Sequence, residues 1–95
     1  MSDALTPTSE RIERSVVSAI RKTAKNALPD VIEGEHSFIS DLDFDSMSIS
    51  MLGLALEDEF GCAILLSGWV ERHSHPESLT VRTLCEYLSE VLPTS

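Results

Sequence analysis

The spacing of hydrophobic residues along the chain predicts helices and no strands. Over residues 8–27, apolar residues recur at about 100° per residue on one arc, and most basic residues lie nearly opposite. The apolar arc consists of Ile12, Val16, Ala19, Ile20, Ala24 and Ala27. This pattern predicts an amphipathic helix that ends before Pro29, because the residue before a proline disfavours the α conformation.

Residues 29–44 follow no clean hydrophobic period and predict a long loop. Its apolar residues, Phe38, Ile39, Leu42 and Phe44, are expected to pin the loop to the core. A loop of this length in a small domain is usually functional.

A second helix is predicted over residues 45–60, with Gly61 ending it. One apolar stripe on this helix is expected to face the core, and it consists of Ile49, Leu52, Leu56 and Phe60. A second apolar stripe lies on the far side and consists of Met47, Met51 and Leu54. Because a chain of 95 residues can hardly supply a second packing layer, we interpret this second stripe as a docking surface.

Two further helices are predicted over residues 64–72 and 80–92, with Thr80 capping the last one. The predicted fold class is therefore all-α, a four-helix bundle with a short third helix and a long loop between helices one and two. A single domain is expected over residues 8–92, with a disordered N-terminus over 1–7 and a tail over 93–95. The predicted core consists of Ile12, Val16, Ile20, Phe38, Leu42, Ile49, Leu52, Leu56, Phe60, Ile64, Leu84 and Leu88.

Charge is distributed very unevenly along the chain. The formal net charge is −9, and residues 26–71 contain ten acidic residues and neither Lys nor Arg. Nucleic acid and anionic membranes would be repelled, so basic proteins are the expected partners. No apolar run is long enough to span a membrane, and no secretory signal is recognisable at the N-terminus. With only two cysteines, the expected location is the cytoplasm.

Two segments carry a resemblance to a known family. Residues 37–47 read Ser-Phe-Ile-Ser-Asp-Leu-Asp-Phe-Asp-Ser-Met, which is similar to the S-F-x-x-D-L-G-x-D-S-L motif of the acyl carrier protein family. Residues 56–61, followed by Ile64, resemble the family's L-E-E-E-F-G-x-x-I. The likeness covers roughly residues 9–92, with one short insertion.

The resemblance implies a carrier rather than an enzyme. Ser46 would receive a 4′-phosphopantetheine arm from coenzyme A, with Asp45 flanking it, and the arm's thiol would carry acyl groups as thioesters in fatty-acid or specialised lipid biosynthesis. Physical chemistry agrees, because a serine in the first turn of a helix places a phosphodiester near unpaired backbone N–H groups. The implied partners are a Mg²⁺-dependent phosphopantetheinyl transferase and acyl ligases, acyltransferases or fatty-acid synthesis enzymes.

Three positions depart from the family pattern and bear on partner choice. The family's glycine is Asp43 here, so any positive-φ turn at that point must be made differently. The acids that usually follow the serine by two and five residues are replaced by Ser48 and Met51. We therefore expect a specialised, monomeric carrier whose partners dock through an apolar patch and a basic rim. The expected docking residues are Met47, Met51, Leu54, Glu57, Asp58 and Glu59.

Other function classes fit less well. Asp41, Asp43 and Asp45 have the spacing that opens an EF-hand loop, but position six is Ser46 instead of glycine and position twelve is Leu52 instead of glutamate. No metal site is therefore expected. No catalytic residue is expected either, because no G-x-S-x-G motif surrounds Ser46. A peptidyl or polyketide-type carrier domain and an unmodified acidic helical adaptor stay open as alternatives.

Overall fold

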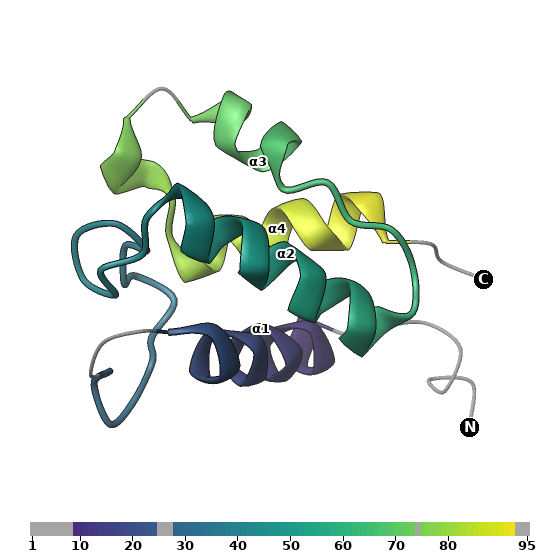
Figure 1. The fold of residues 1–95 in the computed structure, drawn as a ribbon, viewed down its shortest axis with the longest axis horizontal. Coiled ribbons are helices and arrows are strands. Elements are labelled where there is room, and N and C mark those ends of the chain that lie inside the picture. The colour runs from purple at the N-terminus through teal and green to yellow at the C-terminus, as the bar shows by residue number, and fades with distance from the viewer. Residues whose placement is uncertain (1–8, 25–27, 74, 93–95) are drawn as a thin grey trace.

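The computed structural model describes residues 9–24, 28–73 and 75–92, and this part of the chain is helical (Figure 1). Four α-helices are present: α1 (Ser9–Thr23), α2 (Ser46–Phe60), α3 (Ser67–Arg72) and α4 (Val81–Val91). A 3₁₀ turn, η2 (Pro76–Ser78), lies between α3 and α4. The described residues form no strand, and the all-α prediction is confirmed for them. The expectations for residues 1–7 and 93–95 lie outside the described residues.

The helices enclose one core, with α1 packed against both α2 and α4, and α3 packed against α4. Ten of the twelve predicted core residues are buried, but Ile49 and Phe60 are only partly so. Ile49 lines a surface groove described below, and Phe60 is the last residue of α2. The core also contains residues that the prediction omitted, namely Ala19, Phe44, Leu66, Trp69, Leu79, Val81, Tyr87 and Leu92.

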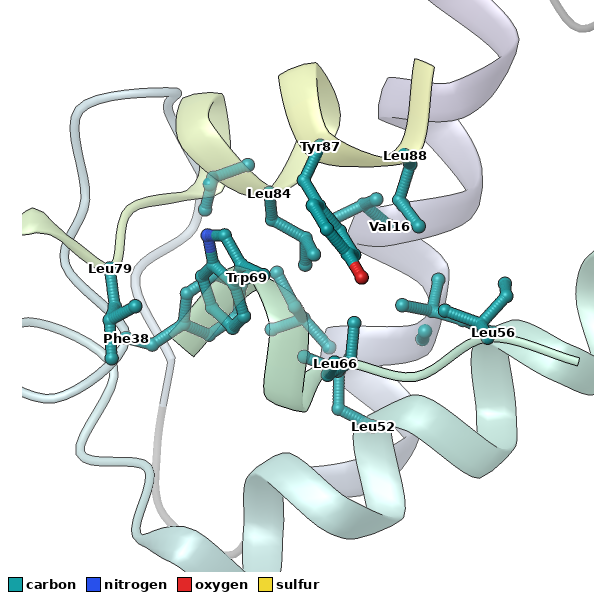
Figure 2. Packing of buried hydrophobic residues seen from close by; sticks show 14 of the residues in the cluster. Val16, Phe38, Leu52, Leu56, Leu66, Trp69, Leu79, Leu84, Tyr87 and Leu88 are labelled. Carbon is teal, nitrogen blue, oxygen red and sulfur yellow. The ribbon is translucent and has the colours of Figure 1, made fainter. Parts of the chain in front are cut away.

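The long loop is pinned to the core, as its apolar residues predict. The backbone N–H of Phe38 donates to the carbonyl of Leu79 (2.8 Å), and that of Val81 donates to the carbonyl of His36 (3.1 Å). The Phe38 ring meets the Phe44 ring edge-on at 5.4 Å and the Trp69 ring edge-on at 5.3 Å. Figure 2 shows Phe38 and Trp69 side by side in the core, with Leu79 beside Phe38. These contacts connect the segment just before α2 to α3.

Two helix boundaries differ from the prediction. The first helix was expected to reach residue 27, but α1 ends at Thr23 and Ala24 is already outside it. The Thr23 hydroxyl donates to the carbonyl of Ala19 (2.8 Å) within this last turn. The remainder of the predicted helix, residue 8 at its start and residues 25–27 at its end, lies outside the described residues.

The third helix begins at Ser67 instead of residue 64, because the preceding backbone makes other hydrogen bonds. The N–H of Ile64 donates to the Glu57 carboxylate (3.0 Å), and the carbonyl of Leu65 accepts from the Tyr87 hydroxyl (2.7 Å). The last helix agrees with its prediction within one residue at each end. Thr80 caps it with a reciprocal pair of bonds to Thr83.

Gly68 allows α3 to lie close to α4, which leads to a stability prediction. A Cβ at Gly68 would lie 2.5 Å from the Tyr87 hydroxyl oxygen, so Gly68→Ala forces that side chain or α3 to move. We expect Gly68→Ala to lower the free energy of unfolding by about 1–3 kcal/mol in urea titrations. In a Tyr87→Phe background, which removes the clashing oxygen, the same change should cost clearly less. Equal costs in the two backgrounds would show that the Tyr87 hydroxyl does not limit the space at Gly68.

Candidate functional site

The site is built at the N-terminus of α2. Asp45 is the N-cap residue in an extended conformation, and its carboxylate accepts a hydrogen bond from the Ser48 N–H (2.8 Å). Ser46 is the first residue of the helix, and its side chain is exposed. The cap therefore holds the helix start in place while the Ser46 hydroxyl faces solvent.

Asp43 makes the turn that precedes the cap. It has φ of 57°, the left-handed region that favours glycine, and it is the only non-glycine residue described with a positive φ. A left-handed aspartate therefore makes the turn at the position where the motif of acyl carrier proteins has glycine. Aspartate and asparagine tolerate this region better than other side chains do.

Substitutions at Asp43 test this conformation. We expect Asp43→Val to lower the free energy of unfolding by about 1–2 kcal/mol, because a β-branched side chain is strained at positive φ. Asp43→Asn is the matched control, since asparagine retains the left-handed preference, and its cost should be clearly smaller. Thermal unfolding of the two variants measures the difference. Similar losses in both would mean that the aspartate charge matters more than the backbone.

An apolar groove begins at Ser46 and runs between α2 and the segment over residues 64–71. Its volume is about 490 Å³. Its walls are mainly the apolar side chains of Ile49, Leu54, Ile64, Leu65, Leu66 and Val70. Gly53 lies on the α2 side, where a Cβ would lie 3.5 Å from Leu66 Cγ, so the small residue lets Leu66 approach the helix. Sequence reasoning missed this groove, because its second wall is positioned by long-range hydrogen bonds. Glu57 of α2 bonds the backbone of Ile64, and Tyr87 of α4 bonds the backbone of Leu65.

The far stripe of α2 is exposed, as predicted. Met47 is 63% exposed, Met51 46% and Leu54 66%. Leu54 also lines the groove, so the stripe and the groove are neighbours. Leu65 and Val70 are exposed on the opposite groove wall. Five of the seven large hydrophobic side chains exposed in the described part of the chain therefore lie on this side of the molecule.

The three acids near the end of α2 have different surroundings. Glu57 is half-buried, and its carboxylate accepts from the Ile64 N–H (3.0 Å). Glu59 forms an ion pair with Lys22 of α1 (3.0 Å). Asp58 is exposed. Of the three predicted docking acids, Glu57 and Glu59 thus have intramolecular partners, whereas Asp58 faces solvent.

The loop aspartates act as backbone acceptors. The Asp41 carboxylate accepts from the Ser37 N–H (2.7 Å), just as Asp45 accepts from Ser48. Among the residues that the structure describes, no three His, Cys, Asp or Glu side chains come together as a possible metal site. The Asp41, Asp43 and Asp45 spacing is therefore explained by the turn and the helix cap.

Cys85 packs against the core from α4, and burial raises the pKa of its thiol to about 11. Burial is the largest cause of this raised pKa, and the nearby charges of Glu13 and Glu86 contribute to it because they oppose a thiolate. At pH 8 the thiolate fraction is roughly a hundredfold below that of a thiol with the ordinary value of 9.0.

We expect alkylation of Cys85 at pH 8 to be slowed roughly in proportion in the native protein. A Cys62→Ser variant leaves Cys85 as the single thiol, so its loss of free thiol with iodoacetamide reports this residue alone. Unfolding the variant in urea should restore an ordinary rate. The raised native pKa also means that the thiol form contributes stability below pH 9, which is lost as the pH rises through 11. Equal alkylation rates in the native and unfolded states would contradict the assigned environment.

Comparisons with known proteins add no relative from which a function could be carried over. No family model, curated protein or solved structure matches the chain. None of the helices in the described ranges is long and apolar enough to cross a membrane.

Proposed function

We propose that the protein is an acyl carrier with Ser46 as the attachment point of a 4′-phosphopantetheine arm. The observation that supports it best is an exposed serine at the first position of α2 that also lines an apolar groove. The motif around Ser46 resembles that of acyl carrier proteins, and the helix order with a short α3 suits such a bundle. The protein itself would catalyse no step.

The helix start suits a phosphodiester. In the attachment step the Ser46 hydroxyl oxygen would attack the phosphate that bears the pantetheine of coenzyme A, with its proton passing to the transferase. The bond between that phosphate and the rest of the pyrophosphate would break, and the adenosine bisphosphate would leave. The phosphodiester on Ser46 then lies at the N-terminus of α2, where backbone N–H groups and the helix dipole favour negative charge.

The groove suits an apolar acyl chain. Its walls are largely aliphatic, and it begins at the residue from which the arm would extend. A hydrocarbon chain that entered the groove would leave water, with a gain of about 25 cal/mol per Å² of apolar surface buried. The arm could thus deliver its cargo to a partner or shelter it against α2.

The proposed partners are a phosphopantetheinyl transferase and the acyl ligases, acyltransferases or fatty-acid synthesis enzymes that load and unload the thiol. We propose a monomer that works in the cytoplasm, where coenzyme A supplies the arm. A peptidyl or polyketide-type carrier would use the same arm with a different cargo. The apolar stripe also fits an unmodified helical adaptor, because docking through Met47 and Met51 would not need an arm.

Intact-mass spectrometry separates a carrier from an adaptor. The full chain is incubated with coenzyme A, Mg²⁺ and a phosphopantetheinyl transferase of broad specificity. We expect a mass gain of one phosphopantetheine per chain. A chain that stays unmodified with transferases of several types, while a known carrier in the same reaction is modified, would favour the adaptor.

A further inference from the structure

A second cavity lies between α1, α4 and the loop at Gly34, and it shares no residue with the groove beside Ser46. Its volume is about 290 Å³. Ligand sites usually have about 300–1,000 Å³, so this cavity suits a small ligand. At roughly 30 Å³ for each water-sized group, it has space for about ten non-hydrogen atoms. Attachment and sheltering of an acyl group involve none of its residues.

The cavity has an apolar floor and a charged rim. The floor consists of buried or partly buried residues, namely Ile12, Val81 and Cys85. The rim consists of exposed charged residues, namely Glu13 on α1 and Arg82 and Glu86 on α4. Two negative charges and one positive charge leave the rim with a net charge of −1. Within the described part of the chain, none of these three charged groups makes an ion pair or a hydrogen bond.

Arg82 is positioned at the loop end of the cavity. Glu86 follows it by four residues on α4, a spacing that permits an ion pair, but the Arg82 side chain lies over Gly34 instead. A Cβ at Gly34 would lie 3.5 Å from Arg82 Nε, and the Arg82 N–H donates to the Gly34 carbonyl (2.8 Å). The absence of a side chain at Gly34 thus leaves space for the guanidinium at this end.

The two carboxylates of the rim come together from different helices. Burial raises the pKa of the Cys85 thiol and the charges of Glu13 and Glu86 add to this effect, so both carboxylates lie near the thiol. The cavity extends from Arg82 to Ser89, about 10 Å along α4. It therefore offers a cation at the loop end, two anions farther along and an apolar surface beneath them.

We propose that this cavity binds a free basic amino acid of the size of lysine. The α-carboxylate would pair with the Arg82 guanidinium, which can bind a carboxylate through two parallel hydrogen bonds. The two ammonium groups would lie beside Glu13 and Glu86, and the aliphatic stem would cover the apolar floor. Lysine has a single net positive charge, which neutralises the rim, and its number of non-hydrogen atoms matches the volume.

Other small ligands satisfy the rim less completely. A diamine would leave the Arg82 guanidinium without a partner, and a neutral amino acid would leave one carboxylate without a cation. An anion such as phosphate would be repelled by Glu13 and Glu86, on a chain with a net charge of −9. A ligand with one carboxylate and two ammonium groups pairs with all three residues.

Free lysine and three analogues, each lacking one charged group, test this binding on the full chain with nitrogen-15 labelling and about 0.15 M salt. Norleucine lacks the side-chain ammonium, cadaverine lacks the carboxylate, and 6-aminohexanoate lacks the α-ammonium. For lysine we expect saturable amide shifts confined to α1, α4 and the loop at Gly34, with a Kd of about 1–10 mM. Each analogue should bind at least about threefold more weakly.

Matched variants locate the binding at the rim. Arg82→Gln should remove the preference for lysine over cadaverine, because the partner of the carboxylate is lost. Glu13→Gln with Glu86→Gln should weaken lysine binding by about fivefold or more. Asp58→Asn with Glu71→Gln, which neutralises two other exposed acids, should leave lysine binding unchanged.

Three results would overturn the proposal. The first is the absence of saturable shifts with lysine well above the expected Kd. The second is equal binding of cadaverine and lysine by the parent chain, which would show a general attraction for cations. The third is unchanged lysine binding by the variant that lacks both Glu13 and Glu86. Modification at Ser46 would be unaffected by any of them, because the cavity and the groove share no residue.

Discussion

Trp69→Ala is expected to lower the free energy of unfolding by about 3–5 kcal/mol. Trp69 is fully buried and lies edge-on to Phe38, and its indole N–H donates to the Thr83 hydroxyl (3.1 Å). Truncation would leave a large cavity between the loop, α3 and α4, as the position of Trp69 in Figure 2 indicates. The free energy of unfolding of a small domain is about 5–15 kcal/mol, so this loss is a large share of the total.

Trp69→Phe serves as the control for this prediction. Phenylalanine keeps most of the ring volume and the contact with Phe38, but it removes the donor to Thr83. Its cost should be clearly smaller than that of alanine, and chemical unfolding followed by circular dichroism measures both. A loss of less than about 1 kcal/mol for Trp69→Ala would contradict the burial of this side chain in the core.

Ser46→Ala is expected to abolish modification by the phosphopantetheinyl transferase completely. The reason is chemical, because the arm is attached through the serine oxygen and alanine has no nucleophile. The exposed side chain makes little contribution to the core, so the variant should keep its helix content and unfold near the midpoint of the parent. Loss of modification would then not be an effect of unfolding.

Ser50→Ala is the matched control for this loss. Ser50 lies one turn along α2, is exposed, and lines the same groove. It should be modified as completely as the parent chain when intact mass is measured under the same conditions. If Ser46→Ala still gained one phosphopantetheine, or if Ser50→Ala lost the gain, the assignment of Ser46 would be wrong.

The features that local sequence determines could be predicted well. Asp45 and Gly61 delimit α2 because one supplies a carboxylate cap and the other a left-handed residue with φ of 68°. Thr80 marks the start of α4 for the same kind of reason. The exposed stripe followed from the helical period alone, since opposite faces of one helix cannot both reach the core of a small domain.

The features that depend on distant contacts could not be predicted. The start of α3 is set by Tyr87 and Glu57, which bond the backbone of Leu65 and Ile64 from other helices. The complete burial of Trp69 depends on Phe38 and on Thr83, neither of which is near it in sequence. The second wall of the groove therefore had no local signal. The arm and its cargo depend on chemistry outside the chain, and only the resemblance suggested them.

Carriage of acyl groups on an arm at Ser46 can be observed in the native protein. The most direct test is the intact mass of the protein purified from its own cells, before and after hydroxylamine treatment, which cleaves thioesters. We expect a mass above that of the chain by a phosphopantetheine plus an acyl group, and loss of the acyl group alone after treatment. A protein whose mass equals that of the unmodified chain, or whose added mass survives hydroxylamine and maps away from Ser46, would contradict it.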